Sequence, residues 1–148
     1  MFLLSLQVNY HVLILIYVLN EVLFYVLNEK IKRDSMRVAI SKLDSLDLAG
    51  QAVTGGYIFK VDYWDNTNSW LSNFSPPSNP GLDIHYVYYY PTPDKIKPTQ
   101  KSYIQNFVNE FEGSLYSPTF SDPVIGYNRY IDEGSFIDYF ILNELARN

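Results

Sequence analysis

The chain has 148 residues, 47% hydrophobic and 18% charged, which is the composition of one globular domain and excludes a disordered tail. It has no cysteine, which excludes a disulfide framework, a thiolate zinc site and a cysteine nucleophile. The net charge of −5 argues against nucleic-acid binding as the main function, and two histidines nearly exclude a multi-histidine metal site.

The first twenty residues carry no charge, and fifteen of them are apolar. No Lys or Arg precedes Lys30, so the basic start of a signal peptide is missing. The longest unbroken apolar run, Val12–Leu19, is short of the roughly 20 residues of a membrane-spanning helix. Residues 5–12 alternate polar and apolar side chains, which favours a strand. We therefore expect residues 1–23 to be a separate strand-like segment, with a membrane segment through residues 1–20 as the alternative.

Three segments are typical of β-strands. Residues 24–27 form the end of a buried strand, and residues 84–90 are aromatic and β-branched up to the stop at Pro91. Residues 57–64 place Phe59 and Val61 on one face and Lys60 and Asp62 on the other. Residues 65–80, rich in Asn, Ser and Pro, are predicted to be a loop.

Two helices follow in the second half of the chain. Thr99 is the expected N-cap of the first, which buries Ile104, Phe107, Val108 and Phe111 and ends at Gly113. The second begins at Ser135, with Asp138 as the partner in its cap. Apolar residues surround most of it, so it is predicted to be centrally buried. Antiparallel strands followed by two main helices give an α+β fold class.

Five of the eleven basic residues fall within residues 30–42, namely Lys30, Lys32, Arg33, Arg37 and Lys42. Since Lys and Arg bind phosphate through charge-assisted hydrogen bonds, this cluster is a candidate phosphate site. A solvated strand end and turn is the alternative. The sequence contains no phosphate-binding glycine loop, no nucleophile elbow and no metal-ligand spacing.

Aromatic residues are unusually frequent, with fourteen Tyr, nine Phe and two Trp. Tyrosine joins an apolar ring to a polar tip and suits both half-buried strands and contact surfaces. One hypothesis is therefore a noncatalytic binding module of a surface or secreted protein, in which residues 65–70 contact a glycan or a protein. A tyrosine-rich sheet without such a role is the alternative.

From Phe24 onward the chain resembles the CotH kinase family, named for spore coat protein H. The matching stretches come in family order, and they cover residues 25–34, 37–43, 54–62, 96–104 and 130–148. Residues 24–148 therefore resemble part of a CotH-like kinase domain. The resemblance implies an atypical protein-kinase-like fold, in which ATP and a divalent metal such as Mg²⁺ serve phosphoryl transfer to protein Ser/Thr hydroxyls.

The resemblance also implies where nucleotide would bind. It places Glu29, Lys30, Lys32 and Arg33 on the nucleotide-side strand and its exit, with Lys60 on a neighbouring strand as a further phosphate ligand. Solvent-facing positions are the alternative for these residues. The protein acceptor is implied by the family, and a secreted or cell-surface location is favoured for the parent protein.

The sequence departs from the family pattern in two places. The family's catalytic and metal-binding aspartates follow the helix that matches residues 135–148, and no equivalent is present here. The glycine turn that usually precedes the first matching strand is also missing, so residues 1–23 need not be native family sequence. We expect a truncated domain that is inactive by itself and that self-associates.

Overall fold

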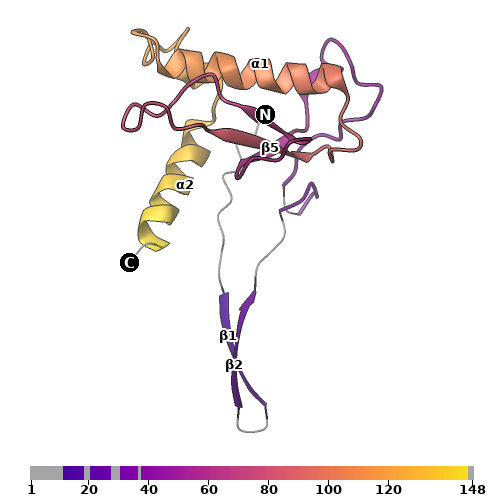
Figure 1. Ribbon diagram of the computed structural model, residues 1–148, viewed down its shortest axis with the longest axis vertical. Coiled ribbons are helices and arrows are strands. Elements are labelled where there is room, and N and C mark those ends of the chain that lie inside the picture. Colours follow the sequence, from indigo (N-terminus) through magenta and orange to yellow (C-terminus); the bar gives the residue numbers. More distant parts are fainter. Residues whose placement is uncertain (1–11, 19–20, 28–30, 37, 147–148) are drawn as a thin grey trace.

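The computed structural model describes residues 12–18, 21–27, 31–36 and 38–146, which form an α+β arrangement of short antiparallel strands and two main helices (Figure 1). The expected fold class is therefore confirmed at this level. The strand-like pattern of residues 5–12 lies almost entirely outside the described residues. No helix among the residues that the structure describes is long and apolar enough to cross a membrane.

A β-hairpin precedes the main sheet. Strands β1 (Val12–Val18) and β2 (Glu21–Leu27) pair antiparallel, with Val12 opposite Leu27 and Val18 opposite Glu21. Their β-branched and aromatic residues favour an extended backbone. The strand end predicted at residues 24–27 is the second half of β2, and β1 and β2 form a two-stranded sheet of their own (Figure 1).

The main sheet has three antiparallel strands in the order β3-β5-β4. They are β3 (Ile58–Val61), β4 (Ser69–Leu71) and β5 (His85–Tyr90). Two were predicted, with β3 shorter than expected. The third, β4, lies inside the segment expected to be a loop. It was not predicted because its three residues form a strand only by pairing with β5. A short 3-10 helix, η1 (Ala52–Thr54), precedes β3.

Helix α1 (Pro98–Leu115) lies along one face of this sheet (Figure 1). Its residues Ile104 and Val108 are almost fully buried, and they belong to a core shared with Phe59, Trp70 and Tyr88. The predicted apolar stripe is thus confirmed. The N-cap is Lys97 rather than Thr99, because Gln100 closes the first turn by accepting from the Lys97 N–H at 2.9 Å. The helix also continues two residues beyond Gly113.

A second set of contacts between α1 and the sheet is polar. Gln105 donates to the hydroxyl of Tyr88, a residue of the core, at 2.6 Å. Buried Glu112 accepts at Oε1 from Tyr86 at 2.9 Å and from Ser72 at 2.7 Å. The hydroxyls of the β5 tyrosines that face α1 therefore form hydrogen bonds with polar side chains of the helix. Without these bonds, burial would leave the hydroxyls unpaired.

The alternation along β5 defines the opposite face of the sheet. Because Tyr86 and Tyr88 contact α1, the neighbours His85 and Val87 belong to the other face. Register places Lys60 of β3 and Ser69 of β4 opposite Val87, and Leu71 opposite His85. The predicted division of residues 57–64 into an apolar and a polar face is confirmed at Phe59 and Lys60.

The chain ends with the 3-10 helix η2 (Tyr127–Arg129) and helix α2 (Glu133–Ala146). Asp132 caps α2 by accepting from the Ser135 N–H at 2.8 Å, so the expected cap of Ser135 with Asp138 is wrong. The expectation that α2 is centrally buried is also wrong, because five of its apolar residues are exposed: Phe136, Ile137, Phe140, Ile141 and Leu145. None of the described residues packs over these five side chains closely enough to bury them.

Candidate functional site: a cationic cluster at Tyr90

Tyr90, the last residue of β5, connects the basic segment to the main sheet. Its hydroxyl accepts from the Leu43 N–H at 3.3 Å, and the Arg33 guanidinium lies over its ring at 5.6 Å from the centroid. Planar guanidinium groups stack favourably on aromatic rings while their N–H donors stay available at the edge. Arg33 is exposed.

Two glycines let the segment that carries Lys42 run close to β3. Gly56 has φ +75°, and a Cβ atom there would lie 2.0 Å from the Ser41 carbonyl oxygen. A Cβ on Gly55 would lie 3.3 Å from the Ser41 Cβ. Only glycine allows this approach at position 56, so the Gly55-Gly56 pair sets the path of residues 41–43 and thereby the position of Lys42.

Lys42 forms an ion pair with Asp44, with 2.8 Å between Nζ and Oδ2. This hydrogen bond raises the pKa of Lys42 and lowers the pKa of Asp44. Lys42 precedes Leu43, whose N–H binds the Tyr90 hydroxyl, and Arg33 lies over the ring of the same tyrosine, so both cations are placed near Tyr90. Arg33, Lys42, Asp44 and Tyr90 are called the Tyr90 cluster below.

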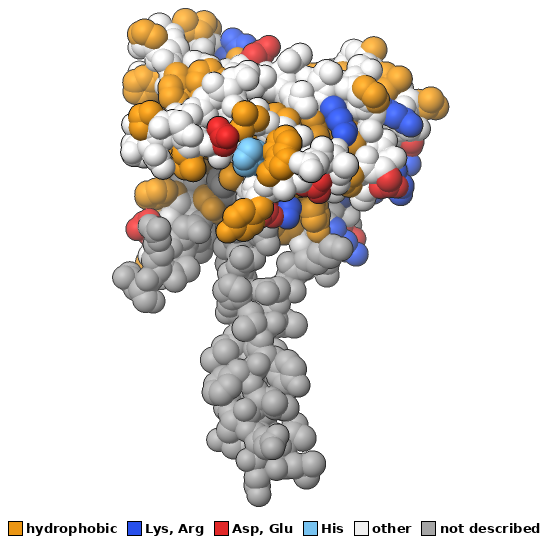
Figure 2. Space-filling view, viewed as in Figure 1, with side chains coloured by type: hydrophobic (Ala, Val, Ile, Leu, Met, Phe, Trp, Pro, Cys, Tyr) orange, Lys and Arg blue, Asp and Glu red, His pale blue; other side chains and the backbone are white. Residues whose placement is uncertain are grey.

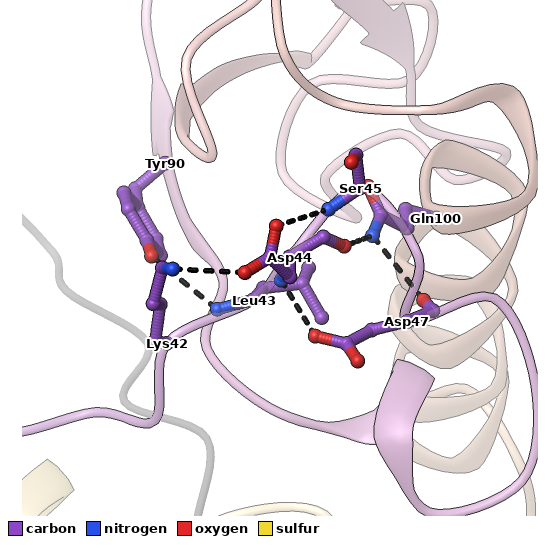
Figure 3. A network of polar contacts seen from close by, with 7 residues as sticks. All are labelled: Lys42, Leu43, Asp44, Ser45, Asp47, Tyr90 and Gln100. Carbon is purple, nitrogen blue, oxygen red and sulfur yellow. Dashed lines mark hydrogen bonds and ion pairs between the residues drawn. The ribbon is translucent and has the colours of Figure 1, made fainter.

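A buried glutamine ties the Tyr90 cluster to the start of α1 (Figure 3). Gln100 donates from Nε2 to the carbonyl oxygens of Asp44 at 2.7 Å and Asp47 at 3.2 Å. The Asp47 carboxylate in turn accepts from the Asp44 N–H at 2.6 Å. The turn that holds Asp44 is thus fixed from both sides, which limits the positions that Lys42 can take.

The Tyr90 cluster presents two cations beside an aromatic ring. No described carboxylate forms an ion pair with Arg33, whereas Lys42 is paired with Asp44. An exposed Arg without a described carboxylate partner suits a phosphate group, as does a Lys close by, since the fork of the guanidinium binds two phosphate oxygens at once. The described residues contain no group of three or more His, Asp or Glu that could hold a metal ion.

The structure brings together only part of the predicted site. Arg33 lies in the Tyr90 cluster, and Lys32 is exposed beside it in sequence. Glu29 and Lys30 lie outside the described residues, as does Arg37 of the basic cluster. Lys60 forms an ion pair with Asp62 on the sheet face opposite α1, and none of its described contacts reaches the Tyr90 cluster.

Lys42 was part of the predicted basic cluster but not of the nucleotide-binding residues that the resemblance implies, and Tyr90 and Gln100 were in neither set. Lys42 belonged to the basic cluster, and its distance of nine residues from Arg33 gave no sign that the two meet at one ring. Tyr90 was one of fourteen tyrosines, and nothing local distinguishes it. Gln100 lies in a stretch that resembles the family, Ile96–Ile104, which was the available signal.

Comparison with known proteins identifies the family of the chain. The family profile described as CotH kinase protein matches residues 23–148, which is most of the chain. No curated protein matches, and no solved structure matches. The profile covers residues 23–27 of β2, the Tyr90 cluster, the main sheet and both helices, and the chain therefore belongs to the CotH kinase family.

Proposed function

We propose that the chain is the nucleotide-binding part of a CotH-family phosphotransferase and that the Tyr90 cluster holds the phosphates of ATP. The observation that carries the proposal is the Arg33 guanidinium, which lies over the Tyr90 ring at 5.6 Å from its centroid. The hydroxyl of the same tyrosine binds the N–H of Leu43, the residue after Lys42, and Arg33 forms no ion pair with a described carboxylate. Membership of the family supports ATP as the phosphate donor and protein hydroxyls as acceptors.

The chemistry of phosphoryl transfer explains why such a cluster is needed. Catalysis depends on positioning the triphosphate and on neutralising charge on the transferred group. Arg33 supplies a positive charge with two N–H donors side by side. Lys42 supplies a second positive charge, which forms an ion pair with Asp44 when no phosphate is bound. The described residues fit the anionic phosphates, but they provide no cluster of metal ligands. A Mg²⁺ ion would neutralise phosphate charge.

We further propose that these 148 residues bind nucleotide without transferring phosphate by themselves. The resemblance implies a catalytic aspartate in a segment that follows the helix matching α2, and these 148 residues hold no match to it. A kinase assay with ATP, Mg²⁺ and a serine-rich acceptor protein should therefore show no transfer. Robust turnover by the chain would contradict this part of the proposal while leaving nucleotide binding intact.

Nucleotide binding is tested with a fluorescent ATP analogue that unlabelled ATP displaces. The variant Arg33→Ala should weaken binding about tenfold or more, because it removes charge-assisted hydrogen bonds to phosphate. Lys95→Ala, which removes an exposed cation outside the Tyr90 cluster, is the matched control and should bind as the unchanged chain does. Equal affinity of Arg33→Ala and the unchanged chain, with both folded by circular dichroism, would refute the proposed site.

A further inference from the structure

The loop after β3 holds an exposed indole in a fixed orientation. The centroid of the Trp64 ring lies 5.0 Å from the centroid of the His85 ring, with 60° between the two ring planes. Its N–H donates to Asn66 Oδ1. Trp64 nevertheless remains 51% exposed, and the neighbouring Tyr63 is 91% exposed. Trp64, Asn66 and His85 are called the Trp64 platform below.

The backbone around the Trp64 platform is itself fixed. Asp62 donates its N–H to the His85 carbonyl at 3.2 Å, which anchors the start of the loop to β5. The Asp65 carboxylate then accepts from the Thr67 N–H and hydroxyl, both at 3.0 Å, and the Asp65 N–H donates to Ser69 Oγ at 3.1 Å. A ligand that meets Trp64 therefore finds a ring already ordered, which reduces the entropy lost on binding.

The chemistry of this surface selects a particular kind of ligand. The indole N–H is already used by Asn66, so the exposed part of the ring offers a π surface. Pyranose rings carry a flat patch of axial C–H groups that stacks on such a surface, with hydroxyls at the rim. The amide of Asn66 and the Lys60–Asp62 pair supply donors and acceptors nearby in the chain. We propose that the Trp64 platform binds a neutral polysaccharide of β-linked, equatorial pyranoses.

The charges around the Trp64 platform exclude other partners. Asp62, Asp65 and Asp83 lie in the segments that form it, and Lys60 is already paired with Asp62. Hydrogen bonds hold the pKa of Asp62 and of Asp65 below the ordinary range, so both stay charged. Figure 2 shows the pale-blue histidine among orange hydrophobic side chains, with an acidic group beside it. Such a surface repels nucleic acids, acidic glycans and anionic membranes.

A neutral glycan also suits this surface better than a peptide does. A peptide side chain gains most of its affinity by filling a recess, whereas a sugar ring needs a flat, oriented aromatic surface with polar groups at its edge. The proposal is independent of nucleotide binding, because no residue of the Trp64 platform belongs to the Tyr90 cluster.

Intrinsic fluorescence gives a direct test, because the chain has two tryptophans in different surroundings. Trp70 is 7% exposed and Trp64 is 51% exposed, so acrylamide quenches mainly Trp64. Cellohexaose or chitohexaose, added without nucleotide, should protect Trp64 from acrylamide. The proposal would be overturned if neither oligosaccharide protects Trp64 at millimolar concentration. It would also be overturned if an unrelated peptide digest protects Trp64 and the sugars do not.

Calorimetry with the same two oligosaccharides measures how much the Trp64 ring contributes to binding. Trp64→Ala should weaken binding about tenfold or more, and Trp64→Phe should retain a larger part of it. Phe140→Ala removes another exposed aromatic ring, 59% exposed on α2, and should bind unchanged. Because Trp64→Ala can disturb the loop, Asn66→Ala serves as a second variant that frees the indole and should also weaken binding. Unchanged affinity of Trp64→Ala and Asn66→Ala would overturn the proposal.

Discussion

The Tyr86 hydroxyl on β5 donates to Glu112 Oε1 on α1 at 2.9 Å, inside the contact between the sheet and the helix. Ser72 donates to the same oxygen at 2.7 Å, and the second oxygen, Oε2, is buried with no partner among the described residues. One carboxylate oxygen of α1 thus binds β5 and Ser72, the residue that follows β4. This arrangement makes Glu112 a sensitive point for stability.

Removing Glu112 should destabilise the fold. In Glu112→Ala the hydroxyls of Tyr86 and Ser72 lose their acceptor in a buried place, and we expect the free energy of unfolding to fall by about 2–3 kcal/mol. Urea unfolding followed by circular dichroism measures the change. The exposed Glu110→Ala on the same helix is the control, and an equal effect of the two substitutions would contradict this role of Glu112.

Alkaline pH should destabilise the fold through its buried tyrosines. Burial raises the pKa of Tyr88 to about 12 from its ordinary 10.0. The folded state therefore favours the neutral phenol, and this contribution is fully present below about pH 10 and is lost as the pH rises toward 12. Tyr88→Phe should make the decline of unfolding free energy over this range less steep. A variant at the exposed Tyr63, Tyr63→Phe, should leave the decline unchanged, and an equal change in both would contradict the prediction.

Substitutions at two glycines with positive φ should distinguish the effect of backbone strain from that of steric overlap. Gly50, with φ +57°, has open space around it, whereas a Cβ atom on Gly56 would overlap the Ser41 carbonyl oxygen. Gly50→Ala should lower the unfolding free energy by about 1–2 kcal/mol through strain alone. Gly56→Ala should lower it further and should also weaken ATP binding, because residues 41–43 must move. Equal stability of the two variants would show that the close approach is not required.

The Asp44 carboxylate should limit phosphate binding by occupying Lys42. Asp44→Asn keeps the carbonyl that accepts from Gln100 but removes the negative partner of Lys42. If Lys42 binds phosphate, affinity for the ATP analogue should rise about two- to fivefold, the range expected for releasing one exposed ion pair. Displacement titration measures this. Unchanged or weaker binding would exclude Lys42 from the phosphate site and leave Arg33 alone there.

The exposed apolar residues of α2 should make the chain self-associate. Phe140 and Leu145 are both exposed, together with three other apolar residues of the helix. Light scattering should show oligomers that grow with protein concentration, and Phe140→Glu should reduce them. Asp138→Asn, on the same helix, is the control and should not reduce them. A monomer at all concentrations would contradict the expectation.

Local patterns in the sequence were sufficient for the elements that depend on local physics. The spacing of Ile104 and Val108 predicted the buried side of α1, and the aromatic run before Pro91 predicted β5. Strand β4 was missed because Trp70 is extended only where it pairs with Tyr86, sixteen residues away. The burial of α2 was mispredicted because apolarity on all sides of a helix does not determine what packs on it.

The candidate site was predictable in kind rather than in detail. The density of Lys and Arg in residues 30–42 pointed to phosphate, and Arg33 was among the residues predicted. That Arg33 and Lys42 meet at Tyr90 depends on the close passage of Ser41 over Gly56, a contact between segments distant in sequence. Residues 65–70 were expected to contact a glycan or a protein, whereas Trp64 was expected at the end of a strand. The orientation of its indole could not be predicted, since Asn66 and His85 set it together.

The two hydrogen bonds from Gln100 have a mechanical consequence. Since its amide spans the carbonyls of Asp44 and Asp47 from the first turn of α1, two hydrogen bonds tie the turn beside Lys42 to the start of that helix. An event that displaces one of them alone must break these bonds. Motion at the cationic cluster would therefore be transmitted along the helix axis rather than absorbed by a flexible loop.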